Sequence, residues 1–336
     1  MALLTDRHPQ KDLFVLDISD VVPKDDMASM EHPFFSLSTK PDMSVLQYQL
    51  GNNELEITPS YHGLPTIFDK DILIFCISQL MHLKNQGQPI GKHVRFSARE
   101  LMIATNRETG GIAYKRLKEA FLRLKGTTFV TNIKTDDKRE TRFFSLIESG
   151  SGFVFHDDDR MRLDFCEVIL SDWVMQAING SDVISISPDY FRLRRPLERR
   201  LYEIARKHCG SQKKWTIRLD NLQKKTGSKS PLYRFRFNLR QIIKEDNTPF
   251  YRFEVDDKDL ISVRPRQAKV AYNKNIKIPK WADEKARSIA REKGWDFYAL
   301  QAKWLSFAEE EAAKGNPPKD VGAAFIAYCN KQDKLR

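Results

Sequence analysis

A short stretch of the chain, Tyr233 to Ile243 (YRFRFNLRQII), places three arginines within seven residues. They are Arg234, Arg236 and Arg240. An arginine side chain donates hydrogen bonds in a planar fork, which fits the O6 and N7 atoms of guanine or two oxygens of a phosphate. The stretch therefore indicates contact with a nucleic acid, provided that one element presents such side chains on an outer face.

The positive charge of the chain is concentrated around this stretch. The 336 residues carry a formal net charge of +11, yet residues 192–244 hold 17 Lys and Arg against three acids, a net of +14. Residues 1–69 carry a net charge of −7. A local excess of positive charge is typical of a nucleic-acid surface, since phosphates are bound by clustered cations.

Other candidate motifs for chemistry do not fit their templates. Residues 87–93 (GQPIGKH) have three residues between the glycines, where a phosphate-binding loop needs four. Residues 156–160 (HDDDR) are adjacent in a turn and cannot all reach one metal ion. The four cysteines form no CxxC pair, and no two histidines stand two residues apart. We therefore expect no enzymatic activity, no metal and no cofactor.

No stretch of 18 uncharged apolar residues occurs, and the N-terminus has no apolar run of signal length. The scattered cysteines are typical of reduced thiols. These features predict a cytoplasmic protein without a membrane partner.

The arginine stretch is better explained by a helix than by a strand. Its strand-like alternation ends after eight residues, whereas a helix aligns five apolar residues on one stripe: Leu232, Phe235, Leu239, Ile242 and Ile243. The opposite face then carries basic, aromatic and amide side chains. We predict a helix from Ser230 to Lys244 whose outer face is suited to DNA, where the exposed Phe237 ring could cover thymine methyl groups.

The elements around this helix occur twice, about 120 residues apart. In each copy a long helix is followed by a short helix, a third helix and a hairpin. The apolar positions coincide, with Leu222 matching Leu101 and Leu239 matching Leu117. The first copy has its third helix at Gly111 to Lys125 and its hairpin in residues 127–149. Two short helices followed by a hairpin are typical of a winged helix, whose last helix enters the major groove.

We therefore predict an α+β fold of two tandem winged-helix domains with a small C-terminal all-α module. The predicted parts are an acidic, partly flexible arm, a first winged-helix domain, a second one, a basic linker and a helical module. Their respective ranges are 1–40, 41–160, 161–266, 267–279 and 280–332.

The residues expected to contact DNA lie on the two third helices, on the turn before the second of them and on the first hairpin. In the second copy they are Lys224, Lys225, Lys229, Ser230, Tyr233, Arg234, Phe237, Arg240, Gln241 and Lys244. In the first copy they are Lys115, Arg116, Lys118, Arg123, Lys138, Arg139 and Arg142. The second copy is the more basic and is expected to dominate recognition.

Four motifs resemble the replication initiator protein A family of bacterial plasmids, and the resemblance runs from about Asp6 to Arg266. They are RHPQKDLFVLDISD, MEHPFFSLSTKPD, ITPSYHGLPTIFDKDILIFCISQL and RPLERRLYEIARKHCG. The resemblance implies sequence-specific binding to repeated sites, or iterons, in a plasmid origin, local duplex opening, and recruitment of host initiator and helicase. It also implies dimerisation through the first winged-helix domain.

Two other functions remain open from the sequence. One is a transcriptional repressor with two winged-helix domains that never opens DNA. The other is a scaffold that binds DNA without sequence preference. An initiator would make a neighbouring AT-rich stretch accessible to a single-strand probe, which a repressor would not do. Scrambling the target would leave the affinity of the scaffold unchanged.

Overall fold

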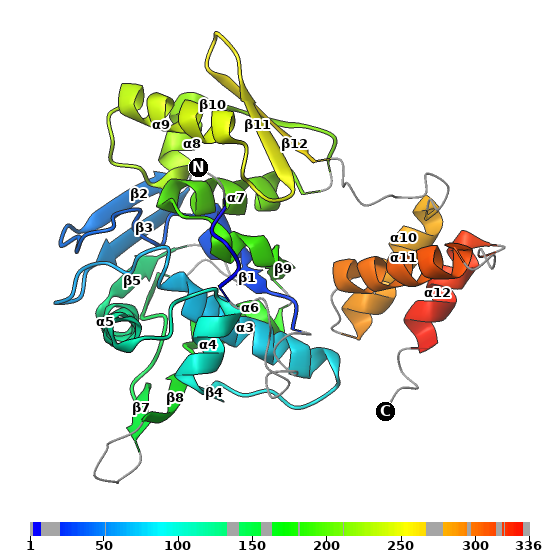
Figure 1. Ribbon diagram of the computed structural model, residues 1–336, viewed down its shortest axis with the longest axis horizontal. Helices are drawn as coiled ribbons and strands as arrows, with labels where there is room; N and C mark the ends of the chain where they lie inside the picture. Colours follow the sequence, from blue (N-terminus) through cyan, green and yellow to red (C-terminus); the bar gives the residue numbers. More distant parts are fainter. Residues whose placement is uncertain are drawn as a thin grey trace. The chain divides into compact units, whose positions relative to one another are not determined.

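The computed structural model describes residues 3–7, 21–50, 52–132, 141–155, 163–180, 182–210, 212–266, 278–293, 297–313, 318 and 320–331. The chain forms two compact units. The first consists of Met1–Met81 and Ile90–Arg266, and the second of His82–Pro89 and Gln267–Arg336. The first unit has a mixed α/β architecture that contains both copies of the repeat, as Figure 1 shows.

The second copy has the predicted order of elements. They are α7 (Pro196–His208), β10 (Trp215–Arg218), α8 (Leu219–Thr226), α9 (Leu232–Glu245), β11 (Tyr251–Val255) and β12 (Leu260–Pro265). The strands form one antiparallel sheet in the order β10-β12-β11. Helix α8 ends at Gly227, whose φ of +72° few other residues adopt, and α9 starts directly after Pro231.

The first copy begins with the same series of helices. They are α3 (Lys70–Asn85), α4 (Ala98–Ala104) and α5 (Gly111–Gly126), with strand β4 (His93–Phe96) between α3 and α4. Ser97 and Glu100 form the predicted capping box at the start of α4. The aligned residues Leu101 and Leu222 are both fully buried, and Leu117 and Leu239 are at most 1% exposed. The helices of the duplication are therefore confirmed.

The predicted correspondence between the two hairpins is wrong. Strands β5 (Thr128–Thr131) and β6 (Arg142–Phe144) do pair, but they join β2 (Leu46–Leu50) and β3 (Asn53–Thr58) in a separate sheet of order β2-β3-β5-β6. The partner of β4 is β8 (Leu163–Ile169), which also pairs with β7 (Gly152–Phe155). The order β4-β8-β7 matches β10-β12-β11, so β7 and β8 are the counterpart of the second hairpin.

The β4-β8-β7 sheet also affects the predicted boundary between the two winged-helix domains. A boundary between residues 160 and 161 would separate the paired strands β7 and β8. A division that keeps the sheet intact would fall after Ile169. In Figure 1 the β7–β8 hairpin and the β11–β12 hairpin project from opposite ends of the first unit.

The later part of the predicted flexible arm belongs to the folded core. Strand β1 (Lys24–Asp26) pairs with β9 (Val183–Ser185), and helix α2 (Met27–Glu31) follows it directly. Asp25 and Met30 are fully buried, and Phe34 is 1% exposed. The stretch looks solvated by composition, but its charged side chains have internal partners, which permits their burial. Residues 24–36 thus form an ordered part of the predicted, partly flexible arm.

Helix α6 (Asp172–Asn179) and the 3-10 helix η2 (Pro188–Arg192) connect the two copies. No helix in the described ranges is both long and apolar enough to span a bilayer. Likewise, those ranges contain no group of three or more His, Cys, Asp or Glu side chains arranged to hold a metal ion.

The described C-terminal residues of the second unit form helices, as the predicted all-α module requires. They are α10 (Lys280–Glu292), α11 (Phe297–Ala313) and α12 (Val321–Lys331). Trp304 and Phe325 pack together in its core at a ring distance of 5.1 Å. Trp281 and Phe307, by contrast, are both 52% exposed. Trp295 lies outside the described residues.

Candidate nucleic-acid interface

The exposed face of α9 carries the side chains that the sequence predicts. Phe235 and Leu239 are fully buried against the rest of the second copy, which fixes the rotation of the helix. Tyr233 is 69% and Phe237 62% exposed, whereas soluble proteins usually bury such rings. Together with the basic side chains around them, these rings form a surface suited to bases and sugars.

The other predicted members of this face are also accessible. Arg234, Arg240 and Lys244 are exposed, and Gln241 is half-buried. Among the described residues, neither the Arg234 nor the Arg240 side chain has a hydrogen-bond or ion-pair partner. Both guanidinium forks are therefore available to an external acceptor. Ser230 lies before the helix, where its backbone carbonyl accepts a hydrogen bond from the side chain of Gln223.

The third arginine of the stretch, Arg236, has an internal role. Its Nε and Nη2 donate to the two carboxylate oxygens of Asp259, at 2.9 and 2.5 Å. Asp259 lies in the turn between β11 and β12 with φ of +58°, and its carbonyl accepts a hydrogen bond from the backbone N–H of Leu219 at the start of α8. Arg236 thereby ties α9 to the hairpin turn.

Sequence reasoning missed the basic residues around this turn. The hydrogen bond from Arg236 lowers the pKa of Asp259, and the charges of Arg240 and Arg218 lower it further. Arg218 is 73% exposed at the end of β10, and Lys258 is exposed in the hairpin turn. Their positions in the sequence could have identified them. Arg218 directly precedes the short helix α8, and Lys258 lies in the turn between β11 and β12, which is the expected wing.

The three lysines around the α8–α9 turn differ in their surroundings. Lys224 is exposed. The Nζ of Lys225 is bonded to the Glu31 carboxylate, and the Nζ of Lys229 lies 2.6 Å from Asp42 Oδ2. Two of the three predicted phosphate contacts are therefore already paired with carboxylates.

Three predicted residues of the first copy, Lys115, Arg116 and Lys118, are exposed on α5. Arg123 donates from Nε and Nη2 to Asp69 at 2.7 and 2.9 Å, and its side chain is 14% exposed. Arg123 is therefore not exposed with the other predicted residues of α5. Arg142 is half-buried in β6 and donates to Gln176 at 2.6 Å. Lys138 and Arg139 lie outside the described residues.

Replacing Arg123 with alanine is expected to destabilise the fold rather than to impair DNA contact directly. The free energy of unfolding should fall by about 3 kcal/mol, because Asp69 would be left buried without its cation. Urea denaturation measures this loss. The matched variant Lys118→Ala, on the exposed face of the same helix, should change stability by less than about 0.5 kcal/mol. Normal stability of Arg123→Ala combined with weaker DNA binding would contradict the internal role.

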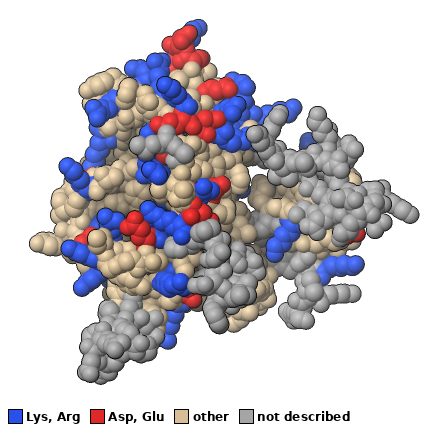
Figure 2. All heavy atoms as spheres, in the orientation of Figure 1, with Lys and Arg blue, Asp and Glu red and all other residues tan. Residues whose placement is uncertain are grey.

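The surface charge is mixed rather than uniformly basic. On the face shown in Figure 2, Lys and Arg lie over the part of the first unit that carries the second copy, with acidic side chains among them. Ion pairs explain part of this mixture, since Arg252 and Arg266 share Asp246. The large net charge of residues 192–244 is also partly neutralised, because Lys225, Lys229 and Arg236 are each paired with a carboxylate.

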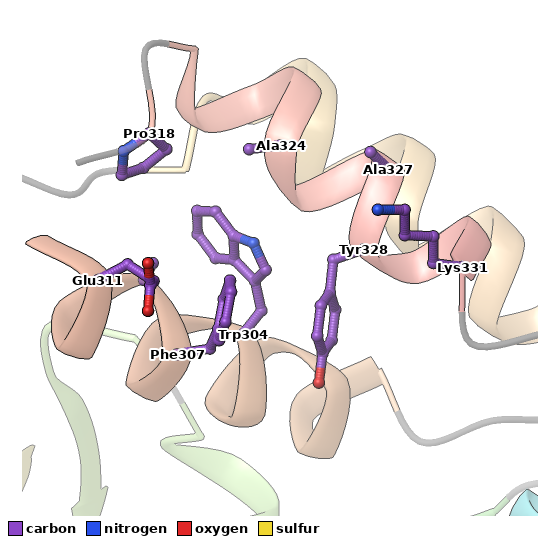
Figure 3. Close-up of a pocket in the computed structure, with 9 residues that line it drawn as sticks. Trp304, Phe307, Glu311, Pro318, Ala324, Ala327, Tyr328 and Lys331 are labelled. Carbon is purple, nitrogen blue, oxygen red and sulfur yellow. The ribbon is translucent and has the colours of Figure 1, made fainter. Parts of the chain in front are cut away.

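The second unit contains a pocket of about 350 Å³ between α11 and α12. Figure 3 shows Trp304 and Phe307 on one side and the alanines of α12 on the other. The lining residues are Trp304, Phe307, Ala308, Glu311, Pro318, Ala324, Ala327, Tyr328 and Lys331. This mainly apolar lining with one acid and one base suits apolar contact more than phosphate binding.

Comparison with known families adds an independent observation. The family described as Replication initiator protein A matches residues 24–253. A relative from Wigglesworthia glossinidia brevipalpis, named "Putative replication protein", is 36% identical over 260 residues. That match covers 76% of this chain and 94% of the relative.

Two solved structures of domains 2 and 3 of RctB have a similar but distant arrangement. Each is 12% identical to this chain, and the TM-scores are 0.46 and 0.47. The matches cover 69% and 70% of this chain and 94% of each solved chain. With TM-scores below 0.5, this likeness supports no conclusion about the fold or the site.

Proposed function

The chain belongs to the replication initiator protein A family, and we propose that it is a plasmid replication initiator that binds double-stranded DNA in a sequence-specific manner. Its targets are repeated sites in the origin, and binding promotes opening of the neighbouring duplex. The observation that carries this proposal is the exposed face of α9, where Arg234 and Arg240, which have no partner among the described residues, stand beside exposed aromatic rings.

Each copy is a winged helix in this proposal. In the second copy α8 and α9 form the helix-turn-helix, α9 enters the major groove, and the β11–β12 hairpin is the wing. In the first copy α5 is the corresponding helix and β7–β8 is the wing, an assignment that the matching strand order supports. Lys115, Arg116 and Lys118 on α5 add contacts to the DNA backbone.

The partners in this proposal are the plasmid origin, the host initiator and the host helicase. A homodimer forms through the first copy. The protein acts in the cytoplasm, on the plasmid itself, and it needs no cofactor for DNA recognition.

Fluorescence anisotropy on the origin repeats and on a scrambled duplex of equal length tests sequence recognition. We expect affinity for the repeats to be at least about a thousand-fold higher at moderate salt. Equal affinities that fall together with rising salt would indicate binding to phosphates alone. In that case the assignment of α9 as a recognition helix would be withdrawn.

Duplex opening needs a separate assay, because a repressor would also pass the binding test. A supercoiled origin plasmid is incubated with the protein and probed with a reagent that reacts with unpaired thymines. An initiator should make an AT-rich stretch beside the repeats reactive. Tight binding without any reactivity would favour a transcriptional repressor.

A further inference from the structure

The turn between α8 and α9 is held by acidic residues that lie far away in sequence. Glu31, at the end of α2, is bonded to Lys225, and Asp42 lies 2.6 Å from Lys229. The side chains of Glu31 and Lys225 are only 25% and 23% exposed, so this pair is partly shielded from water. Two lysines at the turn of the candidate helix-turn-helix therefore already have carboxylate partners.

The backbone around these pairs is also fixed. The buried Arg200 donates from Nη2 to the carbonyl of Lys225 at 2.8 Å and from Nη1 to the carbonyl of Ser29 at 2.8 Å. A Cβ added to Gly227 would lie 2.6 Å from the Cβ of Pro33. The segment that follows α2 therefore packs directly against the α8–α9 turn. This packing holds the carboxylates of Glu31 and Asp42 beside Lys225 and Lys229.

Glu31 has a second neighbour, His208. The Nε2 of His208 lies 2.8 Å from its carboxylate, and the His208 ring stacks on Trp215 at 4.8 Å. Burial disfavours ionisation of Glu31, but hydrogen bonds from His208 and Lys225 outweigh it and hold the pKa of the carboxyl well below its usual range. The carboxylate therefore stays charged at neutral pH.

We propose that Glu31 and Asp42 form an acidic clamp that occupies, at Lys225 and Lys229, the positions of DNA phosphates and so weakens sequence-independent binding. This inference rests on the proposed function, and it describes how DNA binding by the surface around α8 and α9 is regulated. It leaves Arg234 and Arg240 untouched, because neither has a partner among the described residues. The clamp thus reduces backbone contact while base contact remains available.

The test compares the full chain with Glu31→Gln, Asp42→Asn and the double variant. Each is titrated by anisotropy with the repeat duplex and the scrambled duplex across a salt series. Each substitution should tighten binding to both duplexes by about three- to ten-fold at low salt. The slope of log K against log salt should steepen by about 0.9 for each released lysine. In a Lys225→Gln background, Glu31→Gln should give no gain.

A matched control separates the clamp from a general change in charge. Glu54→Gln removes one negative charge from an exposed position in β3 and should change affinity by less than two-fold. Thermal melting confirms that each variant is folded. Asp42→Asn keeps the test decisive if Glu31→Gln does not fold, because Asp42 holds Lys229 independently.

The outcomes distinguish this proposal from the function on which it rests. Unchanged or weaker binding by the folded variants would overturn the clamp, since the carboxylates would then only brace the turn. A lack of binding by every form would overturn it as well. Equal binding of the wild type to both duplexes, with tighter binding by the variants, would support the clamp and contradict sequence-specific recognition.

Discussion

Replacing Lys70 with methionine is expected to lower the free energy of unfolding by about 3 to 5 kcal/mol. The Lys70 side chain is completely buried, and its Nζ lies 2.7 Å from Asp25 and 3.1 Å from Glu203. Methionine has a similar length but no charge, so two buried carboxylates would lose the cation that they share. Urea denaturation followed by circular dichroism measures the change.

The loss should be smaller at pH 5 than at pH 8. Burial raises the pKa of Asp25, although Lys70 opposes the rise. Without Lys70, the folded variant should keep Asp25 protonated at a pH where the unfolded chain has released that proton. The folded state then binds more protons, and stability falls as pH rises between the two pKa values. A destabilisation that does not vary with pH would contradict this account.

Lys115→Met is the matched control for Lys70→Met. Lys115 is exposed on α5, so the same substitution there should change stability by less than about 0.5 kcal/mol. A loss of less than about 1 kcal/mol in Lys70→Met would show that the buried network contributes little beyond packing. DNA affinity should be tested only where the variant is folded.

The position of Lys70 explains why its loss should affect the whole first unit. Asp25 belongs to β1, Lys70 begins α3, and Glu203 lies in the middle of α7. Glu203 also accepts hydrogen bonds from Tyr190 at 2.7 Å and Arg200 at 3.0 Å. Because α3 and α7 are the first helices of the two copies, the network joins both copies to the N-terminal segment.

Apolar spacing was sufficient to predict the helices of the two copies, but α2 and α6 were not predicted. Phe235, Leu239 and Ile242 of the predicted stripe are buried and the face with Phe237 is exposed, as a period of 3.6 residues requires, whereas Leu232 at the start of α9 is exposed. Spacing within a strand carries less information. It predicted that β5 pairs with β6, but the identity of the third strand depends on the tertiary fold, and there the prediction failed.

Charge was the least predictable property, because the sequence does not show which charges pair. Arg234 and Arg236 are two residues apart, yet Arg236 is bonded to Asp259 and Arg234 has no bonded partner among the described residues. Similarly, Lys24, Asp25 and Asp26 look like a solvated run but are at most 7% exposed. Lys24 is bonded to Ser185 and Asp25 to Lys70, both far away in sequence, where local composition gives no signal.

Arg234→Ala and Arg240→Ala are each expected to weaken binding to the origin repeats by about 1 to 3 kcal/mol while leaving affinity for scrambled DNA nearly unchanged. Both side chains extend from the exposed face of α9 without a bonded partner among the described residues, so each can donate two hydrogen bonds to a guanine. A scrambled duplex offers no such fixed acceptor. The loss should therefore appear as reduced discrimination, measured by competition anisotropy at constant salt.

Arg252→Ala is the control for these two variants. Arg252 is 60% exposed on β11 and is paired with Asp246, so its removal deletes the same charge from an exposed site outside the outer face of α9. We expect similar small changes on both duplexes. Equal losses of affinity on repeats and scrambled DNA for Arg234→Ala would assign that side chain to phosphate contact, and α9 would then position the protein on DNA without reading its sequence.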